Sequence, residues 1–239
     1  MNIIVCKDYD EMSLRAAQMV ASQIEEKPNC VLGLATGSTP EGLYAKLVEM
    51  CKKGSLSFKD VTTVNLDEYY PIDPANDQSY RYFMNYHLFD HVDIDKANTN
   101  VPNGTVSDPV AEGKRYEQLV SDLGGIDLQI LGIGRNGHIG FNEPDDKLVL
   151  DTHVTDLTES TIEANARFFA SANDVPRQAL TMGIGTIFKA KKLIVMASGA
   201  SKKDAVSAML ERNVNTNFPA TLLNLHADVT LICTADVLN

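Results

Sequence analysis

The stretch Val31-Leu32-Gly33-Leu34-Ala35-Thr36-Gly37-Ser38-Thr39-Pro40-Glu41-Gly42 decides the fold class of this chain. Its apolar start, Val31–Ala35, predicts a buried strand. The small residues that follow predict a tight turn into a helix over Pro40–Lys53, with Thr39 as the N-cap and Pro40 in the first helical position. A strand that passes through a short turn into a helix is the unit from which α/β folds with parallel sheets are built.

The turn between this strand and this helix also has features of an anion site. Gly37 lets the backbone approach a ligand closely, and the free N–H groups at a helix start attract negative charge. Phosphate binding is therefore one interpretation. An ordinary strand–helix connection with a good cap is the other, and on this segment alone we favour it.

Short apolar runs alternate with amphipathic segments along the whole chain, which predicts a mostly parallel sheet with helices on both faces. No Ser/Gly-rich linker, charge block or internal repeat interrupts the pattern, so we expect a single domain over residues 1–239. Ligands of such sheets bind beyond the carboxyl ends of the strands. The predicted strands are Ile3–Cys6, Val31–Ala35, Val61–Leu66, Ile126–Ile133, Ala179–Met182, Leu193–Ala197 and Val229–Thr234. The predicted helices are Asp10–Glu26, Pro40–Lys53, Ser79–Leu88, Val110–Leu123, Thr158–Phe169 and Ser201–Arg212.

The composition is that of an acidic globular protein. The 239 residues are 44% hydrophobic and 22% charged, which excludes a disordered chain. The net charge of −11 repels phosphate backbones and argues against nucleic-acid binding, but a few local cations can still hold a small phosphorylated ligand. No apolar run reaches the roughly 18 residues of a membrane span, and the first strand is too short for a signal-peptide core, so we expect no membrane partner.

The four cysteines are scattered and contain no Cys-x-x-Cys pair, which argues against a zinc or redox motif. Cys6 and Cys233 lie in apolar runs and are expected to be buried free thiols. Free thiols are typical of a reducing compartment, so we expect a cytoplasmic protein. His87 and His91 are four residues apart but lack the glutamate of a zinc-protease helix, and we expect no metal site there.

Two neighbouring acids, Asp67 and Glu68, follow the predicted strand Val61–Leu66. Side-chain alternation along a strand places Asn65 and Asp67 on one face and Glu68 on the other, so the two acids should not both reach one site. A carboxylate held at a strand end suits proton abstraction. A solvated acidic loop explains the same residues and is the interpretation that this segment alone favours.

A Gly-rich loop, Leu131-Gly132-Ile133-Gly134-Arg135-Asn136-Gly137-His138-Ile139-Gly140-Phe141-Asn142-Glu143-Pro144, follows another predicted strand. Its Gly-x-Gly-x-x-Gly pattern resembles a dinucleotide fingerprint, but that fingerprint requires a helix to start at once. A proline and two acids interrupt here, and no amphipathic pattern appears before Thr158, so we reject dinucleotide binding. His138 and the nearby carboxylate of Glu143 can form an oriented acid/base pair at neutral pH. A structural histidine fits the loop equally well.

Two cations lie where they can complete an anion site. Arg167 is near the end of the predicted helix Thr158–Phe169, and Lys202 follows the predicted strand Leu193–Ala197 at another strand-to-helix turn. Each of them, taken alone, is more commonly a solvated surface charge.

Together these segments resemble the glucosamine-6-phosphate deaminase family over nearly the whole chain. The most specific match is Gly-His-Ile-Gly-Phe-Asn-Glu-Pro at 137–144, because related 6-phosphogluconolactonases share a Gly-His loop but typically continue without Phe-Asn-Glu-Pro. The other matching segments are Leu34–Pro40, Leu66–Tyr69, Arg167–Phe169 and Ala179–Thr186. The resemblance implies a Rossmann-like sheet with a mobile lid. It also implies conversion of glucosamine 6-phosphate and water to fructose 6-phosphate and ammonia, with no redox cofactor and no metal.

The resemblance further implies roles for individual residues. Asp67 matches the base that moves a proton between C2 and C1 of the sugar, and His138 matches the ring-opening acid/base with Glu143 as its partner. Where one form of the family has Asp before Gly-His, this chain has Asn136, which we expect to orient the imidazole by a hydrogen bond without adding charge. The residues that match the phosphate cradle are Thr36, Gly37, Ser38, Thr39, Arg167 and Lys202.

Larger allosteric members of the family run longer than this chain, which ends soon after its last predicted strand. We therefore favour a monomer over a hexamer and expect glucosamine 6-phosphate as the small-molecule partner. A lactonase on the same fold and a non-enzymatic sugar-phosphate sensor are the alternatives. Asp67 and His138, placed in separate strand-end loops, argue against the sensor, since a sensor needs neither.

Overall fold

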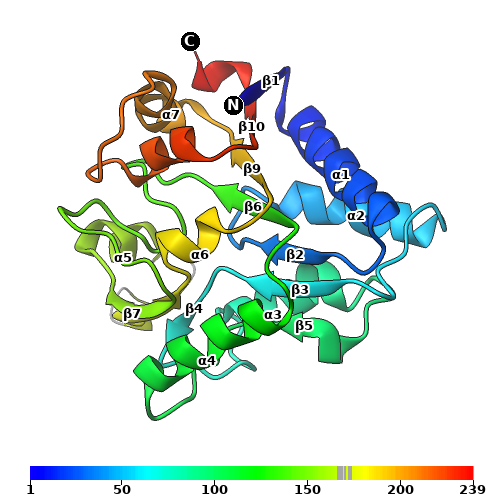
Figure 1. The fold of residues 1–239 in the computed structure, drawn as a ribbon, viewed down its shortest axis with the longest axis horizontal. Coiled ribbons are helices and arrows are strands. Elements are labelled where there is room, and N and C mark those ends of the chain that lie inside the picture. The colour runs from blue at the N-terminus through cyan, green and yellow to red at the C-terminus, as the bar shows by residue number, and fades with distance from the viewer. Residues whose placement is uncertain (166–168, 170, 172–173, 239) are drawn as a thin grey trace.

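The computed structural model describes residues 1–165, 169, 171 and 174–238. Within these residues, seven strands form a parallel sheet in the order β1-β10-β9-β6-β2-β3-β5 (Figure 1). Three more form an antiparallel sheet in the order β4-β8-β7. The parallel strands are β1 (Asn2–Cys6), β2 (Val31–Leu34), β3 (Thr62–Asn65), β5 (Thr99–Asn100), β6 (Leu128–Gly132), β9 (Lys192–Ala197) and β10 (Val229–Thr234). The antiparallel strands are β4 (Asp67–Tyr70), β7 (His153–Asp156) and β8 (Gln178–Thr181).

Helices cover both faces of the parallel sheet. Helices α1 and α2 lie together on one face, and α4, α6 and α7 lie on the other (Figure 1). Right-handed crossovers explain this, because the chain moves along the sheet one way from β1 to β5 and the opposite way from β6 to β10. The predicted α/β class is confirmed. The helices are α1 (Tyr9–Glu26), α2 (Glu41–Lys52), α3 (Tyr80–Met84), which continues as the π-helical turn Asn85–Phe89, α4 (Pro109–Asp122), α5 (Glu159–Asn165), α6 (Ile184–Phe188) and α7 (Lys203–Leu210).

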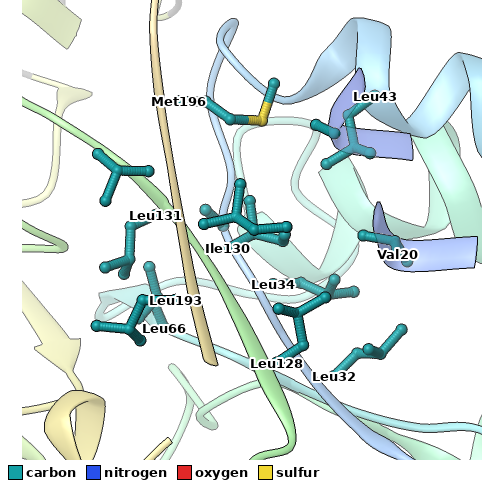
Figure 2. Packing of buried hydrophobic residues seen from close by; sticks show 14 of the residues in the cluster. Val20, Leu32, Leu34, Leu43, Leu66, Leu128, Ile130, Leu131, Leu193 and Met196 are labelled. Carbon is teal, nitrogen blue, oxygen red and sulfur yellow. The ribbon is translucent and has the colours of Figure 1, made fainter. Parts of the chain in front are cut away.

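The main core fills the space between the parallel sheet and its helices. Val20 of α1, Leu43 of α2, Leu34 of β2 and Ile130 of β6 are buried and belong to one cluster (Figure 2). Removing one such side chain from water stabilises the fold by about 1.5–3 kcal/mol. Cys6 and Cys233 are also buried free thiols, as their apolar surroundings predicted. This packing holds the strands, and therefore their carboxyl ends, in fixed positions.

The antiparallel sheet is the main departure from the sequence prediction. The predicted strand Ala179–Met182 does not join the large sheet but forms β8, which pairs with β4 and β7. The chain leaves the parallel sheet at Asn65 and enters the smaller sheet at Asp67. The side chain of Asp67 therefore lies at the junction of the two sheets. In the part of the chain that the structure describes, no helix is long and apolar enough to cross a membrane.

Candidate active site

The candidate site lies at the carboxyl ends of β2, β6 and β9. These three strands are neighbours in the sheet, and the order of crossovers reverses between β2 and β6. The connections that leave adjacent strands in opposite directions open a crevice at such a switch point. The turn 35–40, the loop 133–143 and the turn 198–202 therefore meet at one edge of the sheet.

Asp67 supplies an isolated carboxylate at this edge. Its side chain is buried, with 6% of the residue exposed, and no described residue donates a hydrogen bond to it. Burial, and to a smaller extent the negative charge of Glu68, raises the pKa of Asp67 from 3.8 to about 8. A carboxylate in this environment is a stronger base than one in water.

Glu68 points to the other side of β4 and anchors a helix. Its carboxylate accepts hydrogen bonds from the Ser79 hydroxyl at 2.8 Å and from the backbone N–H groups of Tyr80 and Arg81 at 2.8 and 3.0 Å. It therefore satisfies the free donors at the start of α3. The predicted separation of the two acids is confirmed. The solvated acidic loop is wrong, because both side chains are buried.

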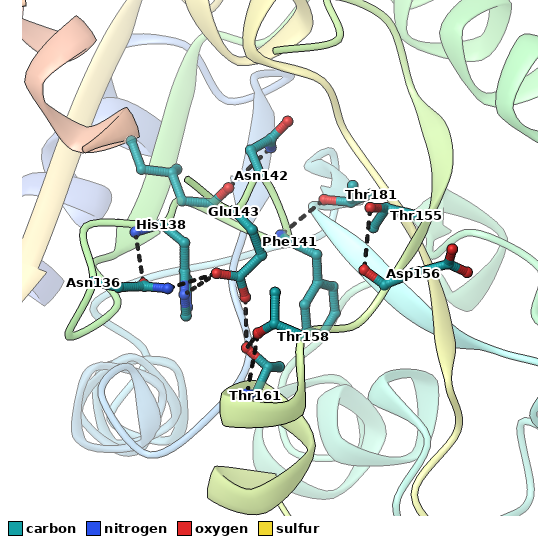
Figure 3. Close-up of polar contacts among 11 residues, drawn as sticks. Asn136, His138, Phe141, Asn142, Glu143, Thr155, Asp156, Thr158, Thr161 and Thr181 are labelled. Atoms are coloured by element: carbon teal, nitrogen blue, oxygen red, sulfur yellow. Dashed lines mark hydrogen bonds and ion pairs between the residues drawn. The ribbon is translucent and has the colours of Figure 1, made fainter. Parts of the chain in front are cut away.

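His138 and Glu143 face each other across the Gly-rich loop (Figure 3). His138 Nδ1 lies 3.4 Å from Glu143 Oε2, which is an ion-pair distance rather than a short hydrogen bond. Burial raises the pKa of Glu143, but the interaction with His138 and the hydrogen bonds from Thr161 and Asn136 outweigh it and lower this pKa to about 2. Glu143 is therefore a carboxylate at every pH at which the fold would be assayed. The loop contains no helix, in agreement with the rejection of dinucleotide binding.

Asn136 orients the glutamate and not the imidazole. Its side-chain amide donates to Glu143 Oε2 at 2.7 Å, and its carbonyl oxygen accepts from the backbone N–H of His138 at 3.2 Å (Figure 3). The prediction that Asn136 hydrogen-bonds the imidazole ring is thus wrong. A neutral amide at this position can donate to the carboxylate, which a second carboxylate cannot do.

Thr161 is a site residue that the sequence did not reveal. It belongs to α5, it is buried, and its hydroxyl donates to Glu143 Oε1 at 2.5 Å (Figure 3). The Thr158 hydroxyl in turn donates to Thr161 Oγ1 at 3.1 Å. Thr161 is the third residue of α5, and no local pattern there indicates a contact with Glu143.

Gly140 brings the Gly-rich loop against Asp67. Its φ is +58°, and a Cβ atom placed on it would lie 3.4 Å from Asp67 Oδ2 and 3.0 Å from Thr181 Oγ1. Thr181 cannot move away freely because its hydroxyl oxygen accepts the backbone N–H of Phe141 at 3.1 Å. Since Gly140 is two residues after His138, the loop that carries His138 and Glu143 also approaches Asp67.

We expect Gly140→Ala to lower kcat roughly 10-fold to 10²-fold, because displacing reacting groups by about 1 Å has effects of that size. Gly124→Ala is the matched control. Gly124 also has a positive φ, of +78°, but a Cβ there would meet nothing within 4 Å. Both variants carry the cost of a left-handed alanine, so steady-state rates corrected for thermal stability isolate the effect on Asp67. Equal rates in the two variants would show that Gly140 does not shape the site.

The turn after β2 presents unused backbone donors. No described residue accepts a hydrogen bond from the N–H groups of Gly37, Ser38 or Thr39. Gly37 has a φ of +89°, and a side chain there would project into open space. The N-cap of α2 is Pro40, with no side-chain capping bond, so the prediction of Thr39 as the N-cap is wrong. The turn thus has free donors at the start of a helix, an arrangement that binds anions.

Of the two predicted cations, the structure describes Lys202. Lys202 ends the 3-10 turn Ala200–Lys202 after β9, two strands away from β2 and at the same edge of the sheet. Gly199, at the start of that turn, has a φ of +88°, which only glycine adopts easily. Arg167 lies outside the described residues.

Comparison with known proteins places this chain in a family. The protein-family model described as "Glucosamine-6-phosphate isomerases/6-phosphogluconolactonase" matches residues 8–232. The chain belongs to this family. Its members among curated proteins include the glucosamine-6-phosphate deaminase of Clostridium beijerinckii, which is 54% identical over all of this chain and 99% of its own length. That of Geobacillus sp. WCH70 is 52% identical over all of this chain and 95% of its own length.

Solved structures of the family agree with the fold described above. A structure described as a monomeric glucosamine-6-phosphate deaminase superimposes with a TM-score of 0.97 at 48% identity and covers 99% of this chain and 98% of its own. The 6-phosphogluconolactonase of Trypanosoma cruzi has a TM-score of 0.78 at 19% identity, with coverage of 99% and 95%. At that identity the similarity between the two structures shows a common fold and nothing more.

Proposed function

We propose that this chain converts glucosamine 6-phosphate and water into fructose 6-phosphate and ammonia, with Asp67 as the base that moves the carbon-bound proton. The observation that carries the proposal is the isolated, buried Asp67 carboxylate, with its pKa raised to about 8, across Gly140 from the His138–Glu143 pair. The names of relatives at 52–54% identity support the same reaction. In this proposal residues 1–239 act as one catalytic unit.

The first step is opening of the sugar ring. A pyranose opens when a proton leaves the anomeric hydroxyl and another reaches the ring oxygen, which is work for a single acid/base group. His138 has this role, because an imidazole gives and takes protons near neutral pH. Glu143, held by Asn136 and Thr161, lies 3.4 Å from His138 Nδ1 and keeps the imidazole ring oriented.

The second step is isomerisation at C2 and C1. In the open aldehyde the C2 proton is acidified by the neighbouring carbonyl, and Asp67 removes it to give an enol that carries the amine. Return of the proton to C1 forms a C1–H bond and leaves an imine at C2. Water adds at C2, the C–N bond breaks and ammonia leaves, which yields the ketose. Every step is a proton transfer, an addition or an elimination, so the proposal needs neither a redox cofactor nor a metal.

The phosphate of the substrate binds to the turn 36–39 in this proposal. The free N–H groups of Gly37, Ser38 and Thr39 can donate hydrogen bonds to the phosphate oxygens. Lys202 and Arg167 add positive charge. Arg167 and the lid segment stay predictions from the sequence. Holding a remote phosphate fixes the sugar relative to Asp67, and such positioning supplies a large part of catalysis.

We also propose that the enzyme works as a monomer in the cytoplasm. The solved relative at 48% identity is described as monomeric, which supports the first point. The scattered cysteines, all four of them free thiols in the structure, agree with a reducing compartment.

Release of ammonia from glucosamine 6-phosphate, measured in a coupled assay, tests the proposed reaction. The same preparation is offered 6-phosphogluconolactone, because lactonases share the fold. Ammonia release without lactone hydrolysis supports the deaminase, whereas lactone hydrolysis without ammonia release overturns it.

Lys202→Ala should raise KM for glucosamine 6-phosphate about 10-fold to 100-fold and change kcat little. A charge-assisted hydrogen bond to phosphate is worth about 1.5–3 kcal/mol, and the phosphate is remote from the bonds that change. Lys189→Ala is the matched control. It removes the same charge just before β9 begins, at the opposite edge of the sheet. Identical KM values in the two variants would remove Lys202 from the phosphate site.

A further inference from the structure

The turn 36–39 is held by two phenol groups that come from the two helices beside it. The hydroxyl of Tyr44, on α2, donates to the backbone carbonyl of Ala35 at 2.5 Å. The hydroxyl of Tyr9, the first residue of α1, lies 2.8 Å from the carbonyl oxygen of Ser38 and 3.1 Å from that of Thr39. Carbonyl groups at both ends of the turn are thus occupied by tyrosines.

Tyr9 also replaces the missing cap of α2. Its phenol oxygen accepts the backbone N–H of Gly42 at 2.9 Å, and Gly42 belongs to the first turn of a helix that has no side-chain cap. A Cβ on Gly42 would lie 2.8 Å from Tyr9 Cε1 and 2.3 Å from Ser13 Oγ, so only a glycine lets α2 approach α1 this closely. One oxygen atom therefore connects the end of the turn to the start of the helix.

The direction of these bonds determines where the free donors of the turn point. In a trans peptide the C=O and N–H groups point in opposite directions. The bond from Tyr9 to the Ser38 carbonyl therefore directs the N–H of Thr39 away from Tyr9, and the bond from Tyr44 to the Ala35 carbonyl directs the N–H of Thr36 away from Tyr44. Without these two hydroxyls the same peptide groups could rotate and turn their carbonyl oxygens toward an anion.

We infer that Tyr9 is a positioning residue for phosphate, and that its hydroxyl fixes the turn 36–39 in the orientation that presents backbone N–H groups to the substrate. Tyr9 touches no reacting atom and adds no charge. It acts by removing conformations of the turn that would repel phosphate. The inference rests on the proposed phosphate role of the turn and extends it to a residue on a different helix.

Tyr9→Phe tests the inference, because it removes one oxygen atom and keeps the ring. We expect the dissociation constant of inorganic phosphate and the KM for glucosamine 6-phosphate to rise together by about 3-fold to 10-fold, which is the size of effect of one or two neutral hydrogen bonds. The kcat should stay within about twofold of the parent. Turnover of glucosamine without its phosphate should not change, since only the phosphate uses the turn.

Tyr82→Phe is the matched control. Tyr82 is 39% exposed and Tyr9 is 37% exposed, but the Tyr82 hydroxyl makes no hydrogen bond to a described residue. Equal phosphate affinity in Tyr9→Phe and Tyr82→Phe overturns the inference, as does a fall in kcat with unchanged phosphate affinity. Amide resonances of Gly37, Ser38 and Thr39, followed during a phosphate titration, report the same affinity directly and do so even if Tyr9→Phe is less stable.

The phosphate titration also separates this inference from the proposed reaction. If the parent binds inorganic phosphate at the turn but releases no ammonia from glucosamine 6-phosphate, the deaminase proposal fails and the comparison of Tyr9→Phe with Tyr82→Phe still decides the role of Tyr9. If the parent releases ammonia and phosphate shifts none of the three amide resonances, the reaction stands and the inference is overturned.

Discussion

Asp67→Asn is expected to lose turnover of glucosamine 6-phosphate by about 10² to 10⁴-fold while it still binds inorganic phosphate. The amide has nearly the same shape as the carboxylate but cannot accept the C2 proton, and general-base catalysis contributes factors of that size. The measurement is kcat by ammonia release together with a phosphate titration. Asp156→Asn, at the exposed end of β7 in the same small sheet, makes the same chemical change outside the site and should keep normal turnover.

The pH dependence gives Asp67 a second, independent readout. Since burial raises the pKa of Asp67 to about 8, the carboxylate needed for catalysis forms only as the pH rises toward that value. We expect kcat/KM of the parent to increase up to about pH 8. If Asp67→Asn keeps more than a tenth of the parent kcat, the base is a different residue.

Stability shows whether the lost activity reflects chemistry or unfolding. In the folded chain Asp67 is neutral below about pH 8, but in the unfolded chain it is ionised above about pH 4, so folding takes up a proton between these values. The stabilising contribution of the neutral form is fully present below pH 4 and is lost as the pH rises through 8. Asp67→Asn does not titrate, and its unfolding midpoint should exceed that of the parent by more at pH 8 than at pH 4.

His138→Gln should lower the turnover rate of the cyclic substrate by about 10² to 10⁴-fold. The rate for a substrate that has no ring to open should stay unchanged. The reason is that His138 is assigned to ring opening alone, as a general acid/base of ordinary efficiency. A suitable probe is an analogue of glucosamine 6-phosphate without the 4- and 5-hydroxyl groups, which cannot cyclise. Exchange of its C2 proton with solvent, followed by NMR, should be about as fast in His138→Gln as in the parent.

The control for this prediction is His226→Gln. The His226 ring contacts the carbonyl of Ala190 at 2.8 Å, near the amino end of β9 and away from the site. It should leave both substrates unaffected. A loss of proton exchange in His138→Gln that is as large for the open analogue as for the cyclic sugar would show that His138 takes part in isomerisation itself.

Most of the parallel sheet could be predicted because its strands lie in largely apolar runs, whereas the two-residue strand β5, Thr99–Asn100, and the pairing of the smaller sheet could not. Strand β4 reads Asp-Glu-Tyr-Tyr and β7 reads His-Val-Thr-Asp, and neither contains the apolar run or the clean alternation by which strands are found. Their pairing with β8 joins residues that are far apart in the sequence for β4 and depends on the tertiary fold. The residues of β8 were therefore predicted correctly to within one position, but its antiparallel pairing with β4 and β7 was not predicted.

The candidate site divides in the same way. The positions of Asp67, His138 and Glu143 at strand ends made them candidates, and the resemblance to the deaminase family supplied their expected roles. The direction of the Asn136 amide depends on a partner seven residues further along the loop, and the bond from Thr161 depends on where α5 packs. Such contacts are set by tertiary structure, and no local pattern encodes them.

A phosphate site built from the N–H groups of Gly37, Ser38 and Thr39 has a consequence for how such a chain changes over generations. Backbone N–H donors are kept in most substitutions. The exposed Ser38 can therefore be replaced by other residues while its backbone N–H still donates to the phosphate. Selection acts instead on whatever shapes the backbone, which includes the glycine at 37 and residues distant in the sequence. Replacing Ser38 by alanine would accordingly understate the importance of the turn, and the informative substitutions are those of Gly37 and of residues outside the turn.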